Sequence, residues 1–296
     1  MATFVVAGVT GRVGSVVATE LVAQGQQVSG ISRGGGAPDV TQGSLADADF
    51  LTRVLSGADG FFALLPEDPF AADFHGGRRA MADAMATAVR ASGVSHVVLL
   101  SAVAASLADG NGPAKDLYYA EHVLRDAATK LSVVRAAWFQ ENVGAVIDAA
   151  NGAGIYPNFM ASADAQFPTV ATRDVGRLAA SLLLSPAAAS EVIDLAGPQY
   201  STRELASALG AMIGKPLRVV DVPAPARAGA LVQAGLPPAF AEAVAELYAC
   251  FESGRVHPQG DRVVTGTTTI HDVLPGLVSV SASRSARSPG RPGPRS

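Results

Sequence analysis

The sequence is poor in cysteine, with Cys250 the only one among 296 residues. A single thiol excludes an internal disulfide and any metal site built from several cysteines. Cys250 lies in an apolar, helical-looking stretch without the basic neighbours of a reactive thiol, so we expect it to be packed in the interior. The five histidines are scattered without the spacing of metal ligands, and no metal site is expected.

Long apolar runs are also lacking. No run approaches the length of about 20 residues that crosses a bilayer. The first residues show no basic region followed by an apolar core and a small-residue cleavage site. These absences favour a cytoplasmic protein that does not enter a membrane.

Positive charge is scarce outside the C-terminal end. The net charge is −4, and residues 279–296 contain four arginines and no acid, so subtracting these four charges leaves a body near −8. An acidic body lacks the basic face with which proteins bind nucleic acid, so no nucleic-acid partner is expected. Residues 279–296 are rich in Ser, Pro, Gly and Arg, which predicts a disordered tail.

Short apolar runs alternate with amphipathic stretches over the first 140 residues. This alternation is typical of a parallel sheet covered by helices and predicts an α/β fold with a doubly wound sheet. We expect one domain over 1–150, whose sheet is completed by strands near 165–196, and a smaller, mostly helical, interleaved region over 151–278. The predicted strands are Phe4–Ala7, Val28–Ser32, Gly60–Leu65, Val97–Leu100, Leu131–Ala136 and Val192–Leu195.

A glycine-rich turn follows the first predicted strand and opens a helix. Its glycines are spaced G-x-x-G-x-x-G. Such glycines let backbone N–H groups approach a pyrophosphate, and the helix N-terminus adds partial positive charge. The turn therefore predicts a Rossmann-type domain that binds a dinucleotide. The predicted contacts are Gly8, Thr10, Gly11, Arg12, Val13 and Gly14.

The end of the second predicted strand indicates which dinucleotide is bound. Enzymes that use NAD commonly place an acidic residue there, which binds the ribose 2′-hydroxyl. Here the strand ends in Ser32 and Arg33, with no carboxylate. Because an arginine can form paired hydrogen bonds with a 2′-phosphate, we expect NADP(H) to be preferred, with NAD(H) as the alternative.

Three further strand ends are candidates for the walls of the adenine and nicotinamide pockets. They contribute Leu45, the pair Leu65 and Pro66, and Ser101. Ligands of doubly wound sheets lie beyond the carboxyl ends of the strands, which favours this role. An ordinary loop explains each of these segments nearly as well.

These residues resemble the NmrA-like family of atypical short-chain dehydrogenase/reductases over about residues 3–277. Residues 8–14 match the family's G-x-T-G-x-x-G loop, and residues 167–176 resemble its F-x-x-x-x-x-x-D-h-G/A element. Residues 135–142 are similar to its R-x-x-x-F-x-x-N segment, which in relatives runs beside the nicotinamide. The resemblance therefore implies cofactor contacts from Phe139, Glu141 and Asn142.

The chain departs from the superfamily at the usual catalytic pair, Tyr-x-x-x-Lys, in which the lysine lowers the tyrosine pKa. Tyr118 is followed four residues later by His122, and Tyr119 by Val123. No catalytic residue is assigned, and Tyr118, Tyr119 and His122 stand only as candidates. An aromatic pocket would favour a planar acceptor, although core packing is the alternative explanation for its residues. The candidate aromatic residues are Phe62, Trp138, Phe139, Tyr118 and Tyr119.

Two functions fit this pattern. Hydride transfer to a quinone depends on positioning more than on a strong protein acid, and the chain is similar in this to type-2 NAD(P)H:quinone oxidoreductases. We therefore expect an NADP(H)-dependent oxidoreductase that reduces a quinone-like or other small electron-poor substrate. The alternative is a non-catalytic, NADP(H)-binding redox sensor that acts through a protein partner. A homodimer is compatible with both.

Overall fold

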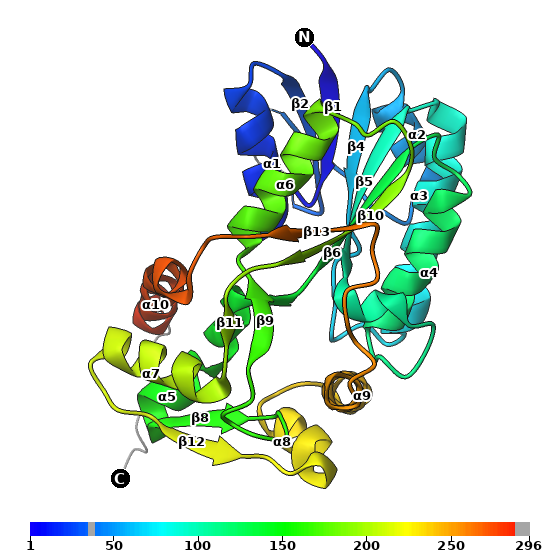
Figure 1. The fold of residues 1–296 in the computed structure, drawn as a ribbon. Helices are drawn as coiled ribbons and strands as arrows, with labels where there is room; N and C mark the ends of the chain where they lie inside the picture. The colour runs from blue at the N-terminus through cyan, green and yellow to red at the C-terminus, as the bar shows by residue number, and fades with distance from the viewer. Residues whose placement is uncertain (35–38, 288–296) are drawn as a thin grey trace, which may run out of the picture.

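Eight parallel strands form one continuous sheet at the centre of the protein (Figure 1). The computed structural model describes residues 1–34 and 39–287, except for the side chains of 282–287. The strands follow the order β13-β10-β6-β5-β4-β1-β2-β3, which confirms the predicted doubly wound α/β fold. They are β1 (Thr3–Ala7), β2 (Gln27–Ser32), β3 (Val40–Gln42), β4 (Gly60–Ala63), β5 (His96–Ala102), β6 (Leu131–Ala136), β10 (Glu191–Ala196) and β13 (Arg262–Thr265).

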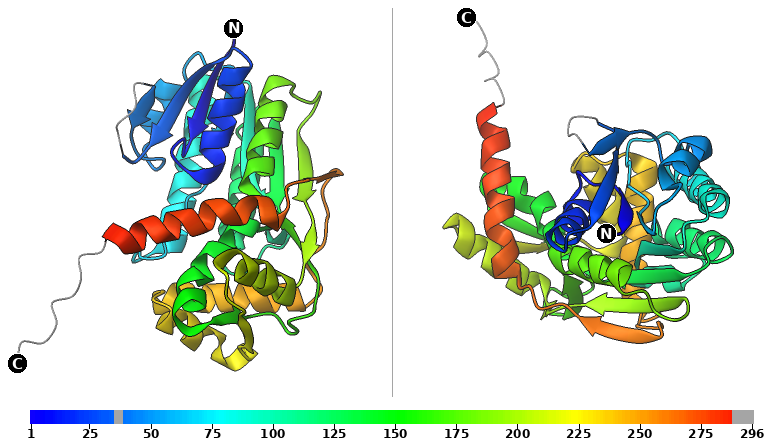
Figure 2. Two further views of the ribbon diagram at one scale, coloured as in Figure 1. Left: turned by 90° about the vertical axis from the view of Figure 1, so that its left-hand side faces the viewer. Right: turned by 90° about the horizontal axis from the view of Figure 1, so that it is seen from above.

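Helices cover both faces of this sheet (Figures 1 and 2). α1 and α6 pack on one face, whereas α2, α3 and α4 pack on the other. Gly176 lets α6 approach α1 closely, because an ideal Cβ there would overlap Val16. No helix in the described part of the chain is both long and apolar enough to span a bilayer. The covering helices are α1 (Arg12–Ala23), α2 (Ala48–Leu55), α3 (Phe74–Ser92), α4 (Ala114–Arg125) and α6 (Thr172–Leu184).

A smaller region lies at the carboxyl ends of the large sheet's strands (Figure 1). It has its own core, which includes Val143, Leu209 and Leu274. Its two small sheets have the orders β11-β9-β7 and β12-β8. The strands are β7 (Trp138–Phe139), β8 (Ile155–Asn158), β9 (Phe167–Val170), β11 (Gln199–Tyr200) and β12 (Arg218–Asp221). The helices are α5 (Ile147–Ala153), α7 (Thr202–Ile213), α8 (Arg227–Gln233), α9 (Pro238–Glu252) and α10 (Ile270–Arg287), with short 3₁₀ turns η1 (Val103–Ser106), η2 (Gln140–Val146) and η3 (Ala224–Ala226).

The two regions exchange strands. Within residues 165–196, expected to complete the large sheet, β10 joins it, whereas β9 pairs with β7 and β11. The edge strand β13 also joins the large sheet, although it comes from the range expected to form the smaller region. The chain therefore crosses between the regions more than once after residue 150.

The C-terminal segment differs from its prediction. Composition indicates disorder over residues 279–296, but α10 continues through Arg287. The helix begins on the core of the smaller region, where Leu274 is fully buried. Once such a helix has been nucleated by packing, adding turns is favourable, and the sequence has no helix-breaking proline in the stretch between Val278 and Ser288. Residues 288–296 lie outside the described residues.

The order of the strands reverses at β1, which pairs with β2 on one side and β4 on the other. Connections that leave in opposite directions from neighbouring strands create a crevice at their carboxyl ends, where ligands of doubly wound sheets bind. The glycine turn after β1 borders this point. The fold therefore places the predicted dinucleotide loop at the sheet's binding crevice.

Candidate active site

The turn between β1 and α1 has the close-packed backbone that its glycines predict. Gly8 has a φ of +63°, a left-handed conformation that favours glycine, and its carbonyl oxygen accepts a hydrogen bond from Gly11 N at 2.8 Å. An ideal Cβ on Gly14 would overlap that same oxygen. No side chain caps the first turn of α1, so its N–H groups are available to an anion. These features fit a bound pyrophosphate.

The end of β2 brings Thr10, Ser32 and Arg33 together beside this turn. Thr10 Oγ1 and Ser32 Oγ are 3.1 Å apart, and Ser32 Oγ also accepts a hydrogen bond from Gly34 N at 3.2 Å. The Arg33 side chain is 75% exposed, and its Nη1 lies 4.0 Å from Asp68 Oδ2. An exposed pair of this length contributes little to stability, so the guanidinium can turn toward a phosphate.

A cleft of about 650 Å³ opens beyond the carboxyl ends of β1, β4, β5 and β6. Many of the predicted cofactor contacts line it: Gly8, Gly11, Arg12, Val13, Gly14, Leu65, Pro66, Ser101, Phe139 and Asn142. Leu45 instead belongs to the core between the sheet and α2, α3 and α4. Side chains from four strand ends and the helix that follows β1 therefore meet in one cavity.

The cleft has an apolar wall formed by Leu117 of α4 and by Leu247 and Phe251 of α9. Two contacts hold α9 in place over the cleft. The rings of Phe74 and Phe240 meet edge to face with centroids 5.2 Å apart. An ideal Cβ on Gly112 would overlap the backbone of α9, so the loop before α4 lies directly against that helix. Burial of apolar ligand surface is expected here.

Ser101, at the end of β5, is part of a buried polar chain below the cleft. Its hydroxyl donates a hydrogen bond to Glu121 Oε1 at 2.6 Å, and Arg135 binds the same carboxylate with Nε at 3.0 Å and Nη2 at 2.6 Å. Burial opposes the charge of Arg135, but its hydrogen bonds to Glu121 and the charge of that carboxylate raise the arginine pKa. Because the Ser101 hydroxyl proton is donated to Glu121, only the lone pairs of Ser101 Oγ are available to a group in the cleft, as a hydrogen-bond acceptor.

Comparison with known proteins identifies the family of this chain. The sequence model of the NmrA-like family matches residues 1–272 of this chain. The chain belongs to the NmrA-like family. A reductase from Streptomyces griseus subsp. griseus, named for the substrate (4-alkanoyl-5-oxo-2,5-dihydrofuran-3-yl)methyl phosphate, is 30% identical over 250 residues, which are 80% of this chain and 83% of that one. An NAD(P)H azoreductase from Xenophilus azovorans is 25% identical over 208 residues, 70% of each protein.

Solved structures share the fold of this NmrA-like chain. The triphenylmethane reductase of Citrobacter sp. in complex with NADP(H) has a TM-score of 0.73 at 18% identity, covering 94% of this chain and all of that one. An NADPH-dependent quinone oxidoreductase from Escherichia coli in complex with NADPH has a TM-score of 0.69 at 21% identity, covering 93% of this chain and 99% of the other. The expectation of an NmrA-like protein from the reductase class is confirmed by the two curated relatives.

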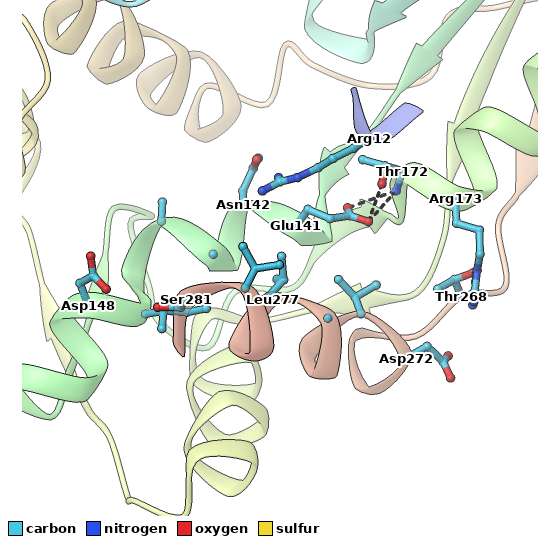
Figure 3. Close-up of a pocket in the computed structure, with 16 residues that line it drawn as sticks. Arg12, Glu141, Asn142, Asp148, Thr172, Arg173, Thr268, Asp272, Leu277 and Ser281 are labelled. Carbon is cyan, nitrogen blue, oxygen red and sulfur yellow. Dashed lines mark hydrogen bonds between the residues drawn. The ribbon is translucent and has the colours of Figure 1, made fainter. Parts of the chain in front are cut away.

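Glu141 supports the start of α6. Its buried carboxylate accepts hydrogen bonds from Thr172 N at 3.0 Å and Thr172 Oγ1 at 2.7 Å, and so fixes the start of α6 (Figure 3). It lines a second cavity of about 870 Å³ between η2 and α10. Arg12 extends beside Asn142 above Glu141, and these two residues line both cavities (Figure 3). Of the two predicted cofactor contacts, Asn142 lines the cleft and Glu141 does not.

The three catalytic candidates lie outside the cleft. The Tyr119 hydroxyl donates a 2.6 Å hydrogen bond to Asp83 on α3, which raises the tyrosine pKa. His122 is exposed, and its ring lies against that of Tyr118. Ala114 and Leu117 are the α4 residues that, with Pro113 just before them, line the cleft. None of Tyr118, Tyr119 and His122 is among the residues that line the cleft, and a catalytic role for them stays a prediction.

The aromatic pocket is only partly present. Trp138 and Phe139 line the cleft, whereas Phe62 is completely buried in the core beneath α1 and α6. Leu247 and Phe251 were not predicted from the sequence, because they come from a helix more than a hundred residues after the last strand expected to border the cofactor. Arg78, which also lines the cleft, was not predicted either. The sequence signal that could have found it is its position four residues before Ala82, on the buried face of α3.

Proposed function

We propose that this NmrA-like protein is an NADPH-dependent reductase that transfers hydride to a small, conjugated, electron-poor organic acceptor such as a quinone. The main observation in support is that the glycine turn and the apolar wall of Leu117, Leu247 and Phe251 line the same cleft. The cofactor and a planar apolar acceptor could therefore lie against each other, with the acceptor on the apolar wall.

The side chains of the cleft support this class of acceptor. Among the described residues that line it there is no tyrosine, lysine or histidine. Reduction of a simple ketone produces a strongly basic alkoxide and benefits from a protein acid, whereas a reduced quinone can take its proton from water. Ser101 cannot replace the acid, because its hydroxyl proton is donated to Glu121. The curated relatives, which reduce azo compounds or an acylated dihydrofuranone phosphate, also act on conjugated acceptors.

The preference for NADPH is supported by the end of β2. Bound NADPH would supply the hydride, with its pyrophosphate at Gly8, Gly11 and the first turn of α1. Arg33, exposed and weakly paired, would bind the 2′-phosphate, while Thr10 and Ser32 hold the end of β2 beside it. Trp138, Phe139 and Asn142 would border the nicotinamide.

A fluorescence titration with NADPH and NADH, followed by addition of menadione to the preferred complex, tests this proposal. We expect tighter binding of NADPH than of NADH and oxidation of NADPH once menadione is present. Binding without oxidation by menadione or by an azo dye would contradict the enzymatic role and favour a redox sensor. Failure to bind either dinucleotide would reject the proposal altogether.

A further inference from the structure

Arg78 is a buried cation in the wall of the cleft. It belongs to the second turn of α3, lines the cleft and is only 3% exposed. Burying a guanidinium is costly unless its donors are paired. The hydrogen bonds made by the guanidinium N–H groups of Arg78 therefore indicate whether this side chain needs a ligand to be fully paired.

The hydrogen bonding of Arg78 is incomplete. Its Nε is buried without a hydrogen-bond partner. Its Nη1 lies 3.4 Å from Oε1 of Glu67, whose side chain is 56% exposed. The nearest buried carboxylate, Asp116, is 3.9 Å from Nε, too far for a hydrogen bond, and already binds His75 at 2.6 Å and Arg79 at 3.4 Å.

Arg135 shows what a completed buried arginine looks like in the same protein. Its Nε and Nη2 both donate to Glu121 at no more than 3.0 Å. Arg78 lacks such a carboxylate but faces the cleft instead. A planar guanidinium with unused donors is suited to two parallel hydrogen bonds with an oxyanion.

We propose that Arg78 binds an oxyanion substituent of the acceptor, so that the substrate class is a planar conjugated molecule with a carboxylate, sulfonate or phosphate group. This inference rests on the proposed reductase function, and the apolar wall of Leu117 and Leu247 would hold the conjugated part. The substituent takes the place of Glu67, whose exposed side chain can turn into solvent and release Nη1. Arg78 is in this scheme a specificity-determining residue.

Methyl red and its methyl ester provide a matched pair of probes that differ by one negative charge. Their affinities for the NADP⁺ complex can be followed by quenching of Trp138, the only tryptophan, which lines the cleft. We expect the carboxylate to bind at least about tenfold more tightly than the ester, as a charge-assisted hydrogen-bonded pair would give. Arg78→Met should reduce this preference to about twofold or less.

Arg79→Met is the control, because Arg79 is the next residue, also contacts Asp116 and does not line the cleft. It should keep the preference of the natural protein. Glu67→Gln removes the competing carboxylate and should increase the preference severalfold. Because Glu67 also lines the cleft, this gain should disappear when Arg78→Met is added, which separates release of Arg78 from simple loss of a negative charge. Arg78→Lys keeps the positive charge but loses the paired N–H donors of the guanidinium, so it should retain part of the preference for the carboxylate.

The same measurements can overturn the inference. It fails if the natural protein does not prefer the carboxylate, if Arg78→Met keeps the preference, or if Glu67→Gln lowers it. A loss of NADPH affinity in Arg78→Met with the preference unchanged would assign Arg78 to a phosphate of the cofactor instead, and would also overturn it. All these readouts are binding constants of a complex already formed with NADP⁺, so they are separate from failure of the proposed function, which appears as failure to bind the dinucleotide or as absence of NADPH oxidation.

Discussion

Gly14 of α1 lies so close to the carbonyl oxygen of Gly8 that no side chain fits between them. This contact brings the start of the helix onto the turn that follows β1. The same approach directs the N–H groups of the first helical turn toward the cleft. Helix packing and the expected anion site therefore depend on one missing side chain.

Gly14→Ala should destabilise the protein and weaken NADPH binding together. We expect a loss of about 1–3 kcal/mol in the free energy of unfolding, because the added methyl group forces the helix and turn apart. Chemical denaturation and NADPH titration would measure both effects. Gly25→Ala is a control for loss of glycine elsewhere, since nothing would meet its Cβ, although its φ of +73° still costs some stability. Unchanged NADPH affinity in Gly14→Ala would contradict the role of the turn.

Arg33→Asp should change cofactor choice. The substitution replaces a group that attracts the 2′-phosphate by one that repels it and can accept from a 2′-hydroxyl, so NADPH affinity should fall by about tenfold or more. NADH affinity should change much less. Titration of both dinucleotides measures the ratio, and equal losses for the two would refute the assignment of Arg33.

Glu121→Gln should show how much the buried chain below the cleft contributes. The change leaves Arg135 as a buried charge without its carboxylate, for which we expect a loss of roughly 3–5 kcal/mol in the free energy of unfolding. Glu20→Gln breaks the exposed pair with Arg177 and should cost less than about 1 kcal/mol. Both losses can be measured by urea denaturation. Similar values for the two variants would mean that the buried hydrogen-bonded chain contributes no more to the free energy of unfolding than an exposed ion pair.

Tyr118→Phe and His122→Gln should each change the rate of NADPH oxidation by less than about twofold, because neither side chain reaches the cleft. A general acid normally contributes roughly a hundredfold or more, so the two expectations are easily separated. Steady-state rates with a quinone are sufficient. A large decrease for either variant would identify that residue as a proton donor.

His96 should make stability depend on pH. It is buried in β5, its Nε2 contacts Ser132 Oγ at 3.0 Å, and burial lowers its pKa below the ordinary value of 6.5. Between the lowered pKa and pH 6.5, His96 is therefore protonated in the unfolded chain and neutral in the folded protein. The stability present above pH 6.5 should fall as pH decreases from 6.5 toward the lowered pKa. His96→Gln should flatten this part of the curve of unfolding free energy against pH; an unchanged slope would exclude His96 as its cause.

The parts of the site that could be predicted are those fixed by local sequence. Gly8, Gly11 and Gly14 are needed by one turn, so their spacing alone indicates its geometry. The orientation of Tyr118 depends on the register of α4 against the sheet, which one sequence does not define. Phe251 reaches the cleft through packing of α9 against α3, a contact between segments far apart in the chain. Arg78 was missed because a polar helix residue is usually solvated.

The position of α9 has a consequence for how this protein can diversify. The glycine turn is encoded within the first fifteen residues, whereas the helix α9, which lines the same cleft, is encoded at 238–252. Under the proposed function, mutations in that late segment would change the range of accepted compounds and leave the glycine turn unaltered. Exchanging this single helix between homologues would then alter acceptor choice without touching the first fifteen residues.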